Sequence, residues 1–437
     1  MSWGHAEALQ SASADPRLTA VEKRVFRKIA WRVVPLLTIA YIVNFLDRTN
    51  VAIAALTMNQ DVGLTTAQFG YGAGILFLGY CLFEVPSNVA LYRFGARRWL
   101  SRIMVSWGII SVAMIFTTGP ASFYALRLLL GVAEAGFFPG AAFYLAQWFP
   151  PQYRARILAW FLLGIPASTM IGGPVSSLLL EMNGMWGLAG WKWLFIIEGA
   201  PAIVLGVLIL IRLVDKPDQA NWLSDEEKTV VRLHLSTEIK EREKRGLLAS
   251  LTDGRVLLLA LIQFLFTAGS YGVVIFLPLI LKGQHFSNFA IGFLTAVPSL
   301  AACVVMIWWA AAVDRSGRKI AGLGLACLVS GTGLLVAVWS DSFVVSFLGL
   351  TFVVIGTNAA RAIFWTIPTR FLSGIGAAGG LAFINSIGVV GGFVGPSIMG
   401  LLKDATGSFD AGLMVLGGFL LLSMAFAFSL KLLIVRE

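Results

Sequence analysis

The sequence predicts an all-α polytopic membrane protein with twelve transmembrane helices in two pseudo-symmetric six-helix bundles. Its 437 residues are 58% hydrophobic and only 13% charged, and the mean hydropathy is +0.82. A soluble chain carries about 25% charged residues. Apolar runs of about 18 or more residues recur along the whole chain, and each is long enough to cross a bilayer as a helix. Helices are expected because they satisfy their own backbone polar groups inside lipid.

Glycine, proline and charged residues divide the apolar sequence into twelve predicted spans. In the first half we expect them at residues 29–56, 69–91, 98–118, 121–147, 156–180 and 192–213. In the second half we expect them at residues 255–281, 289–313, 319–340, 343–367, 376–402 and 411–433. The predicted organisation is a tail of residues 1–28, an N-terminal bundle of residues 29–214, a linker of residues 215–254 and a C-terminal bundle of residues 255–433.

The linker has the composition of a soluble segment, because charged residues dominate "DKPDQANWLSDEEKTVVRLHLSTEIKEREKRG". Ser224 precedes three acidic residues, Asp225, Glu226 and Glu227. A serine followed by a negatively charged first turn is typical of a helix N-terminus. The linker is therefore predicted to hold a short polar helix outside the membrane.

Lysine and arginine lie almost entirely in alternate loops between the predicted spans. The tail and the loops on its side of the membrane carry most of them, whereas the opposite loops hold only Lys192, Lys282 and Lys403. By the positive-inside rule both termini are predicted to be cytoplasmic. The same distribution accounts for the net charge of +10 without any binding of nucleic acid.

The two halves of the sequence resemble each other. "RFGARR" begins at Arg93 and "RSGRK" begins at Arg315, an offset of 315 − 93 = 222 residues. Pro174 in "GGPVSS" and Pro396 in "GGFVGPSIMG" are also separated by 396 − 174 = 222 residues. Two independent motifs with one offset indicate an internal repeat of six spans. Repeated halves with a binding site between them are typical of secondary transporters.

Four charged residues lie deep in the predicted spans. Asp47 and Arg48 are adjacent in the first span, and Arg127 and Glu134 lie in the fourth. Each costs about 2.5–3.5 kcal/mol at the centre of a helix on insertion scales, so such residues usually line a cavity or an ion path. Residues 127 and 134 share a helix face but are about 10 Å apart along its axis. We therefore expect each to find its partner on another helix.

Several stretches of the chain resemble the major facilitator superfamily. "AAVDRSGRK" matches the loop between the second and third helices of each half, and "NVALYRFGARR" is a degenerate first-half copy with Tyr92 in place of Asp. More narrowly, the chain is similar to the anion:cation symporter family along its whole length, through "NFLDRTNVAIAAL", "RLLLGVAEAGFFPG", "GWKWLFIIEGAPA" and "INSIGVVGGFVGPSIMGLLKDATG". The likeness is greatest to bacterial tartrate, phthalate and sugar-acid transporters.

This resemblance implies the proton-coupled uptake of a small organic anion. Carried over by motif, it implies proton-coupling roles for Asp47 and Glu134 and substrate-binding roles for Arg48 and Arg127. Galactonate-type members have Tyr where this chain has Phe45, so galactonate itself is disfavoured. The alternative from the residues alone is that the four charges are structural ion pairs that hold helices together.

Weaker candidates for substrate binding are polar residues at helical spacing. Tyr41 and Asn44 share a face with Arg48, and Gln263 lies on a similar stripe with Thr267 and Ser270. Either stripe is equally well explained by hydrogen bonds between helices. Tyr80 matches a family position near the substrate, and Asn385 is a candidate cavity amide from the second half.

A further set of charged residues is predicted to serve gating or structure. Glu84, just before Pro86, is expected to brace the cytoplasmic gate. Arg361 is interpreted in the same way, and a contact between Arg361 and the anion is the alternative. The paired loop motifs contribute the remaining members, which are Arg93, Asp314 and Arg315.

The predicted function is a transporter that works by alternating access, not an enzyme. We expect a monomeric, multi-pass protein of the bacterial inner membrane, with the bilayer, the anion and the proton as its partners. The three cysteines have no metal-ligand spacing and the glycine-rich runs lack a P-loop lysine, so no metal or cofactor is expected. Two alternatives remain, a drug or metabolite efflux antiporter of the same fold and a membrane anion sensor.

Overall fold

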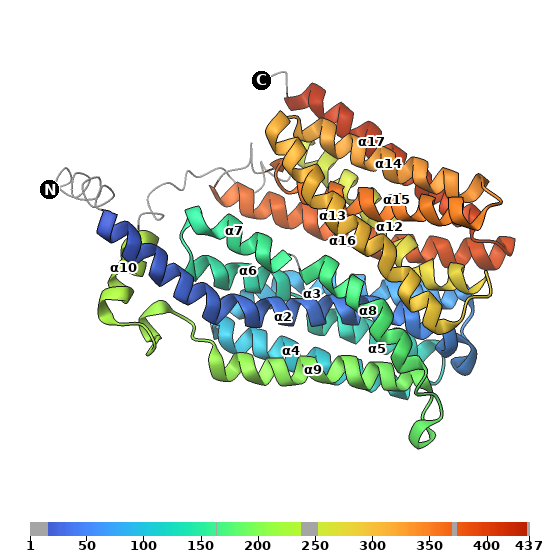
Figure 1. Ribbon diagram of the computed structural model, residues 1–437, viewed down its shortest axis with the longest axis horizontal. Helices are drawn as coiled ribbons and strands as arrows, with labels where there is room; N and C mark the ends of the chain where they lie inside the picture. The colour runs from blue at the N-terminus through green and yellow to red at the C-terminus, as the bar shows by residue number, and fades with distance from the viewer. Residues whose placement is uncertain (1–15, 163, 237–251, 369–373, 435–437) are drawn as a thin grey trace.

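The computed structural model describes residues 16–162, 164–236, 252–368 and 374–434. Every regular element within these ranges is a helix. Twelve helical stretches are long and apolar enough to cross a membrane, which confirms the predicted all-α class and the twelve spans. The first half forms the lower bundle of Figure 1 and the second half forms the upper one.

Eight labelled α-helices build the six spans of the first bundle. They are α2 (Pro16–Val62), α3 (Thr66–Phe94), α4 (Ala96–Ala113), α5 (Pro120–Glu134), α6 (Phe137–Trp148), α7 (Pro151–Leu162), α8 (Gly164–Leu180) and α9 (Gly190–Arg212). The fourth span is divided into α5 and α6, whereas α7 and α8 flank residue 163, which lies outside the described residues. Two short 3₁₀ turns, η1 (Met114–Phe116) and η2 (Met185–Gly187), follow α4 and α8. The first helix begins well before residue 29 because the charged segment ahead of the apolar run continues the same helix.

Six unbroken helices form the second bundle. They are α12 (Gly254–Lys282), α13 (Asn288–Ser316), α14 (Lys319–Trp339), α15 (Phe343–Phe364), α16 (Gly374–Thr406) and α17 (Asp410–Ile434). Both α2 and α17 have their terminal residues at the same end of the molecule, on the left of Figure 1. We refer to this end, where α2 begins, as the terminal end, and to the opposite end as the far end.

The linker contributes a short 3₁₀ turn, η3 (Pro217–Gln219), and the helix α10 (Asp225–Ser236). The Ser224 hydroxyl accepts a hydrogen bond from the Glu227 amide, and the Glu227 carboxylate accepts one from the Ser224 amide. This capping box confirms the predicted helix start. Lys28 on α2 also binds Glu227, at 2.7 Å. Burial opposes ionisation of Glu227, but the hydrogen bonds from Lys28 and Ser224 outweigh it and hold its pKa below the usual value.

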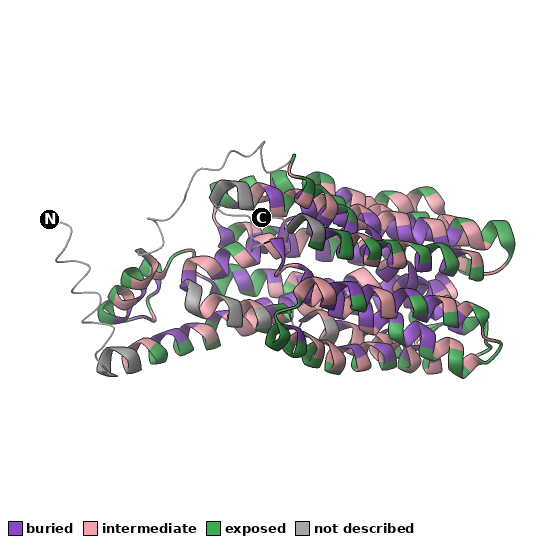
Figure 2. Ribbon diagram, turned by 90° about the horizontal axis from the view of Figure 1, so that it is seen from above, coloured by how far each residue is buried: buried purple, intermediate pink, exposed green. Residues whose placement is uncertain are grey.

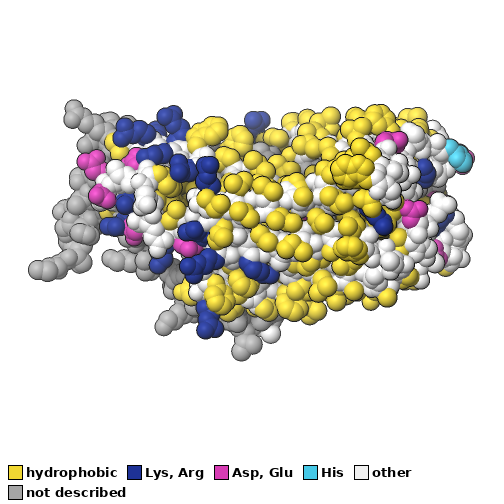
Figure 3. Space-filling view, turned by 90° about the horizontal axis from the view of Figure 1, so that it is seen from below, with side chains coloured by type: hydrophobic (Ala, Val, Ile, Leu, Met, Phe, Trp, Pro, Cys, Tyr) yellow, Lys and Arg dark blue, Asp and Glu magenta, His cyan; other side chains and the backbone are white. Residues whose placement is uncertain are grey.

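The outer surface has the character of a lipid-facing protein. Large apolar side chains such as Trp308, Val304 and Ile307 of α13 are exposed, and exposed residues line the outward faces of the helices in Figure 2. On the face seen in Figure 3, hydrophobic side chains form a broad belt, and Lys and Arg gather at the terminal end.

The two bundles meet along three helix pairs, α3 with α16, α8 with α13, and α2 with α12. Glycines allow the backbones to approach closely, as is common between membrane helices. A Cβ atom on Gly70 would lie 2.3 Å from the Pro396 carbonyl oxygen, and one on Gly173 would lie 2.5 Å from that of Gly292. These contacts involve the start of α3, the end of α16 and the start of α13, so they close the space between the bundles at the far end.

Candidate functional site

Arg48 of α2 and Glu134 of α5 form an ion pair in the interior of the first bundle. The Arg48 Nε donates to Glu134 Oε2 at 2.7 Å, and Asn44 Nδ2 donates to the same oxygen at 3.2 Å. The Glu134 side chain is fully buried, whereas that of Arg48 keeps 11% of its surface exposed. Glu134 Oε1 has no hydrogen-bond partner among the described residues. One carboxylate oxygen therefore accepts two hydrogen bonds, and the other accepts none from the described residues.

Asp47 and Arg48 do not pair with each other, although they are adjacent in sequence. Successive residues of a helix point in different directions, so Asp47 faces α4 instead. Its carboxylate accepts hydrogen bonds from Trp107 Nε1, from Ser111 Oγ at 2.8 Å and from Asn50 Nδ2 at 3.2 Å. Asp47 thus lies in the contact between α2 and α4.

Arg127 is the most deeply buried cation of the site, with no exposed surface. Its Nη2 donates to the Ala73 carbonyl at 3.2 Å, while Nε and Nη1 find no partner in the part of the chain that the structure describes. Arg127 lies within electrostatic range of both Glu134 and Asp47, and it does not form a direct ion pair with Glu134. The four residues Asp47, Arg48, Arg127 and Glu134 therefore share one electrostatic neighbourhood, which we call the charged cluster.

The fourth span breaks directly after Glu134. The helix α5 ends there, Gly136 adopts a left-handed conformation with φ +86°, and α6 begins at Phe137. Pro139 has no N–H, so the Ala135 carbonyl lacks its usual helical donor. The Ser87 hydroxyl donates to this carbonyl at 2.6 Å and itself accepts from Trp99 Nε1 at 2.9 Å. Sequence reasoning missed this break and the role of Ser87, although the Gly136–Pro139 spacing is the signal that could have revealed them.

Replacing Gly136 with alanine is expected to destabilise the protein by about 1–3 kcal/mol, because a side chain is strained at this backbone conformation. A Cβ atom there would also lie 2.4 Å from Ser87 Oγ. Thermal unfolding of the purified protein would show a melting temperature lower by a few degrees. Gly63→Ala is the matched control, since Gly63 has φ +70° but nothing within 4 Å of the place that a methyl group would occupy. Equal losses in the two variants would contradict the role given to the Ser87 contact.

A small cavity of about 40 Å³ lies between the two bundles, and its lining includes Thr49, the neighbour of Arg48 in sequence, but no residue of the charged cluster. Five helices line it: α2, α8, α12, α13 and α15. Phe45 forms part of this lining, and the Arg48 guanidinium lies 5.4 Å from the centre of its ring and 4.7 Å from that of Tyr80. A volume of this size holds a few water molecules, so a larger solute requires the bundles to separate.

The weaker candidates are divided between the cavity and the helix contacts. Tyr41 is buried in an aromatic cluster and stacks on Phe161, with ring centres 4.3 Å apart. Ser270 lines the cavity, whereas Gln263, on the same stripe, packs against Gly388 of α16. On the predicted polar stripe of α12, Ser270 is therefore placed where it could contact a solute, whereas Gln263 belongs to the contact between α12 and α16.

The residues predicted to serve gating also lie in different places. Asn385 of α16 donates to both carboxylate oxygens of Glu84 of α3, at 2.8 and 3.1 Å, and so links the two bundles. Arg361 of α15 lines the cavity and donates to Ser270 Oγ at 3.4 Å. The residues of the predicted loop motifs lie at the ends of α3 and α13 and outside the cavity. Arg93 and Arg315 are exposed, and Asp314 is 4.0 Å from Lys319.

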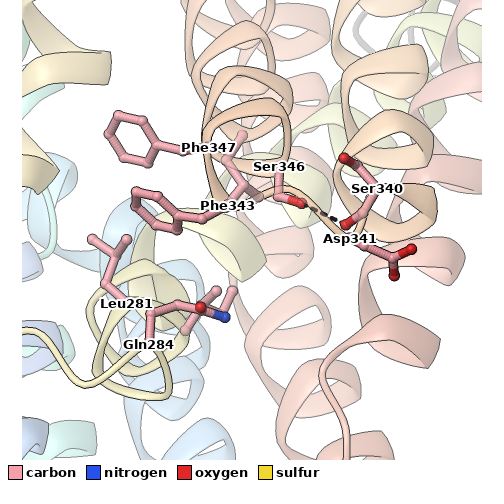
Figure 4. Close-up of a pocket in the computed structure, with 9 residues that line it drawn as sticks. Leu281, Gln284, Ser340, Asp341, Phe343, Ser346 and Phe347 are labelled. Atoms are coloured by element: carbon pink, nitrogen blue, oxygen red, sulfur yellow. Dashed lines mark hydrogen bonds between the residues drawn. The ribbon is translucent and has the colours of Figure 1, made fainter.

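A second cavity, of about 100 Å³, lies at the far end of the second bundle, next to the turn between α14 and α15. Its lining includes the rings of Phe343 and Phe347, and Ser346 donates a hydrogen bond to the Ser340 carbonyl at 3.1 Å. The Asp341 carboxylate points away from these rings (Figure 4). With no cation in its lining, this cavity lacks the charged chemistry of the first one.

Comparison with known protein families gives a match over most of the chain. The model of the Major Facilitator Superfamily matches residues 37–396. A relative from Agrobacterium vitis, named "Putative tartrate transporter", is 48% identical over 92% of this chain and 90% of its own length. The "Quinolone resistance transporter" of Acinetobacter baumannii is 41% identical over 90% of this chain and 91% of its own length.

Solved structures of low sequence identity show the same fold. A bacterial homologue of the human lysosomal transporter Spinster has a TM-score of 0.75 at 18% identity, covering 91% of this chain and 96% of its own. A D-xylose-proton symporter has a TM-score of 0.71 at 15% identity, covering 91% of this chain and 97% of its own. The fold of two six-helix bundles is therefore shared with these transporters.

Proposed function

This chain belongs to the Major Facilitator Superfamily, and we propose that it imports a small organic anion, such as tartrate, together with protons. It is a multi-pass membrane transporter and not an enzyme. The names of the Agrobacterium vitis relatives support tartrate as the first substrate to test. The bond between Arg48 and Glu134 is the observation that supports coupling to protons.

Arg48 can hold either Glu134 or a substrate carboxylate through its Nε–H, but not both at full strength. While Glu134 is ionised, the pair is neutral, and an added anion would leave an unbalanced negative charge in a medium of low dielectric constant. A proton on the free Oε1 of Glu134 removes that charge and weakens the ion pair. Arg48 is then available to a carboxylate in the cavity, so the proton and the anion favour each other's binding.

The rest of the charged cluster supports this exchange in the proposal. Arg127 lies in range of Glu134 and Asp47, and its guanidinium places a positive charge beside the proposed proton site. We propose Asp47 as a second coupling carboxylate, acting through the field that it shares with Arg127 and Glu134. The aromatic rings of Tyr80 and Phe45 position the Arg48 guanidinium from the cavity side.

Alternating access follows from the way the bundles meet. We place both termini in the cytoplasm, because Lys and Arg gather at the terminal end, and we place the protein, as a monomer, in the bacterial inner membrane. The far end is then extracellular, and its close glycine contacts act as the outer gate. Asp404 of α16 supports this gate, since its carboxylate accepts a hydrogen bond from the Ala67 amide of α3 at 2.9 Å. The Glu84–Asn385 link acts nearer the cytoplasm, and the loop residues Arg93, Asp314 and Arg315 stabilise the inner ends of the helices.

Drug efflux in exchange for protons is the second candidate, favoured by the quinolone resistance relative. Two arginines next to the cavity, Arg48 and Arg361, favour an anion over a cationic or neutral drug. The two functions differ in which substrate moves and in which direction, so one transport assay can separate them.

Purified protein in proteoliposomes is expected to accumulate tartrate when the outside is made acidic relative to the lumen. Accumulation should collapse on addition of a protonophore and should be missing from liposomes without protein. A sodium gradient alone should drive no accumulation. Uptake that follows sodium and ignores the pH gradient, or transport of quinolones with no transport of tartrate or another small aliphatic carboxylate, would contradict the proposal.

A further inference from the structure

Arg361 is a cavity cation that differs from Arg48 in its charge balance. Arg48 is bound to Glu134, whereas Arg361 forms no ion pair with any carboxylate in the described part of the chain. Its one hydrogen-bonding contact there is the long one, 3.4 Å, to the neutral hydroxyl of Ser270. A guanidinium in a membrane interior costs free energy unless an anion or water balances it. Within the described residues, Arg361 therefore has no carboxylate that balances its charge.

Arg361 lines the cavity, and Arg48 lies next to Phe45, a lining residue from the opposite bundle. Arg48 lies on α2 of the first bundle and Arg361 on α15 of the second. Tyr41 lies within electrostatic range of both guanidinium groups. Tyr271, which lines the cavity together with Arg361, lies within range of Arg48. Arg361 therefore borders the cavity directly, whereas Arg48 lies behind its first-bundle wall, 5.4 Å from the centre of the Phe45 ring.

The surface between the two arginines suits a hydroxylated solute. Side-chain hydroxyl groups and one amide enter the lining from five helices, and they belong to Thr49, Thr169, Ser270, Tyr271, Ser299 and Asn358. Such groups both donate and accept hydrogen bonds. They complement alcohols on a short carbon chain, while the two cations complement its charged ends.

We propose that Arg361 binds a second carboxylate of the substrate, so that the site selects short hydroxylated dicarboxylates over the matching monocarboxylates. This inference rests on the proposed function, because it assigns the first carboxylate to Arg48. A diacid held at both ends connects the two bundles through its own length. Binding would then draw α2 and α15 together and favour the occluded form of the transporter, an effect that a monoacid cannot produce.

Tartrate and threonate are the probes that test this assignment, since threonate replaces one carboxylate of tartrate with a hydroxymethyl group. Binding to the purified full-length protein is measured by titration calorimetry. We expect wild-type protein to prefer tartrate. Arg361→Gln should weaken tartrate binding by about 10- to 100-fold, the size of one charge-assisted contact, and should change threonate binding by less than about threefold. Arg361→Lys should recover part of the tartrate affinity.

Two further variants make the result specific. Arg318→Gln, at an exposed arginine of the same bundle, should leave both affinities unchanged, and melting temperatures without ligand should show that each variant is folded.

Arg48→Ala should lose the binding of both tartrate and threonate. Suppose that Arg48→Ala binds neither ligand, while Arg361→Gln weakens tartrate and threonate binding equally or leaves both unchanged. Arg361 then does not bind the second carboxylate, although the proposed function stands. If Arg48→Ala keeps both ligands, the proposed function itself fails. Wild-type protein that binds threonate as tightly as tartrate, or binds neither, overturns the selectivity for diacids.

Discussion

Replacing Arg48 with alanine is expected to abolish anion uptake in proteoliposomes, lowering the initial rate by about 100-fold or more. Two effects add to this loss. The substrate loses the partly exposed guanidinium that lies behind Phe45 of the cavity lining, and the buried Glu134 loses the partner that balances its charge. Removing one member of a buried charge pair costs about 3–5 kcal/mol. Uptake of labelled tartrate under an imposed pH gradient measures the effect.

Stability and transport must be separated in this experiment, because the same ion pair affects both. A double variant, Arg48→Ala with Glu134→Gln, removes the uncompensated charge as well, so it should recover most of the melting temperature while uptake stays absent. Arg32→Ala is the control on the same helix, at an exposed arginine that lies over the Trp222 ring, and it should transport normally. Full uptake by a folded Arg48→Ala protein would show that the substrate is bound elsewhere.

Much of the fold follows from the sequence because the bilayer imposes a simple rule on it. Runs of about 20 apolar residues were enough to predict the twelve spans, and two motifs repeated at an offset of 222 residues predicted the two bundles. The length of α2 was underestimated, since hydropathy marks where the lipid ends and not where the helix ends. The division of the fourth span was missed because it depends on one carbonyl, that of Ala135, and on a donor 48 residues away.

The partners within the site could not be predicted in the same way. The sequence shows Asp47 beside Arg48, yet the structure pairs Arg48 with a residue 86 positions away and turns Asp47 towards α4. Such contacts depend on how helices rotate about their axes, which is determined by the packing of many small residues. Arg361 illustrates the same limit, because the sequence left a gating role and an anion contact both open, and only the neighbouring helices show that it lines the cavity.

Glutamine at position 134 is expected to separate binding from coupling. The Glu134→Gln side chain keeps an oxygen that accepts from Arg48 and Asn44 but has no charge and takes up no proton. Accumulation driven by a pH gradient should therefore disappear, so that the ratio of inside to outside tartrate falls to about one. For one coupled proton and a gradient of one pH unit, the wild-type ratio would approach about ten.

Counterflow, the exchange of labelled for unlabelled tartrate without a gradient, tests whether the same variant still binds and moves the anion. A site that is permanently neutral at this position binds the anion without a proton, so exchange should persist in Glu134→Gln and should no longer fall as the pH rises. In wild-type protein, exchange should decrease with rising pH, because ionised Glu134 recaptures Arg48. Asp47→Asn provides the decisive comparison. If that variant loses accumulation while Glu134→Gln retains it, the coupling proton resides on the carboxylate that faces α4, and the exchange of partners at Arg48 does not drive transport.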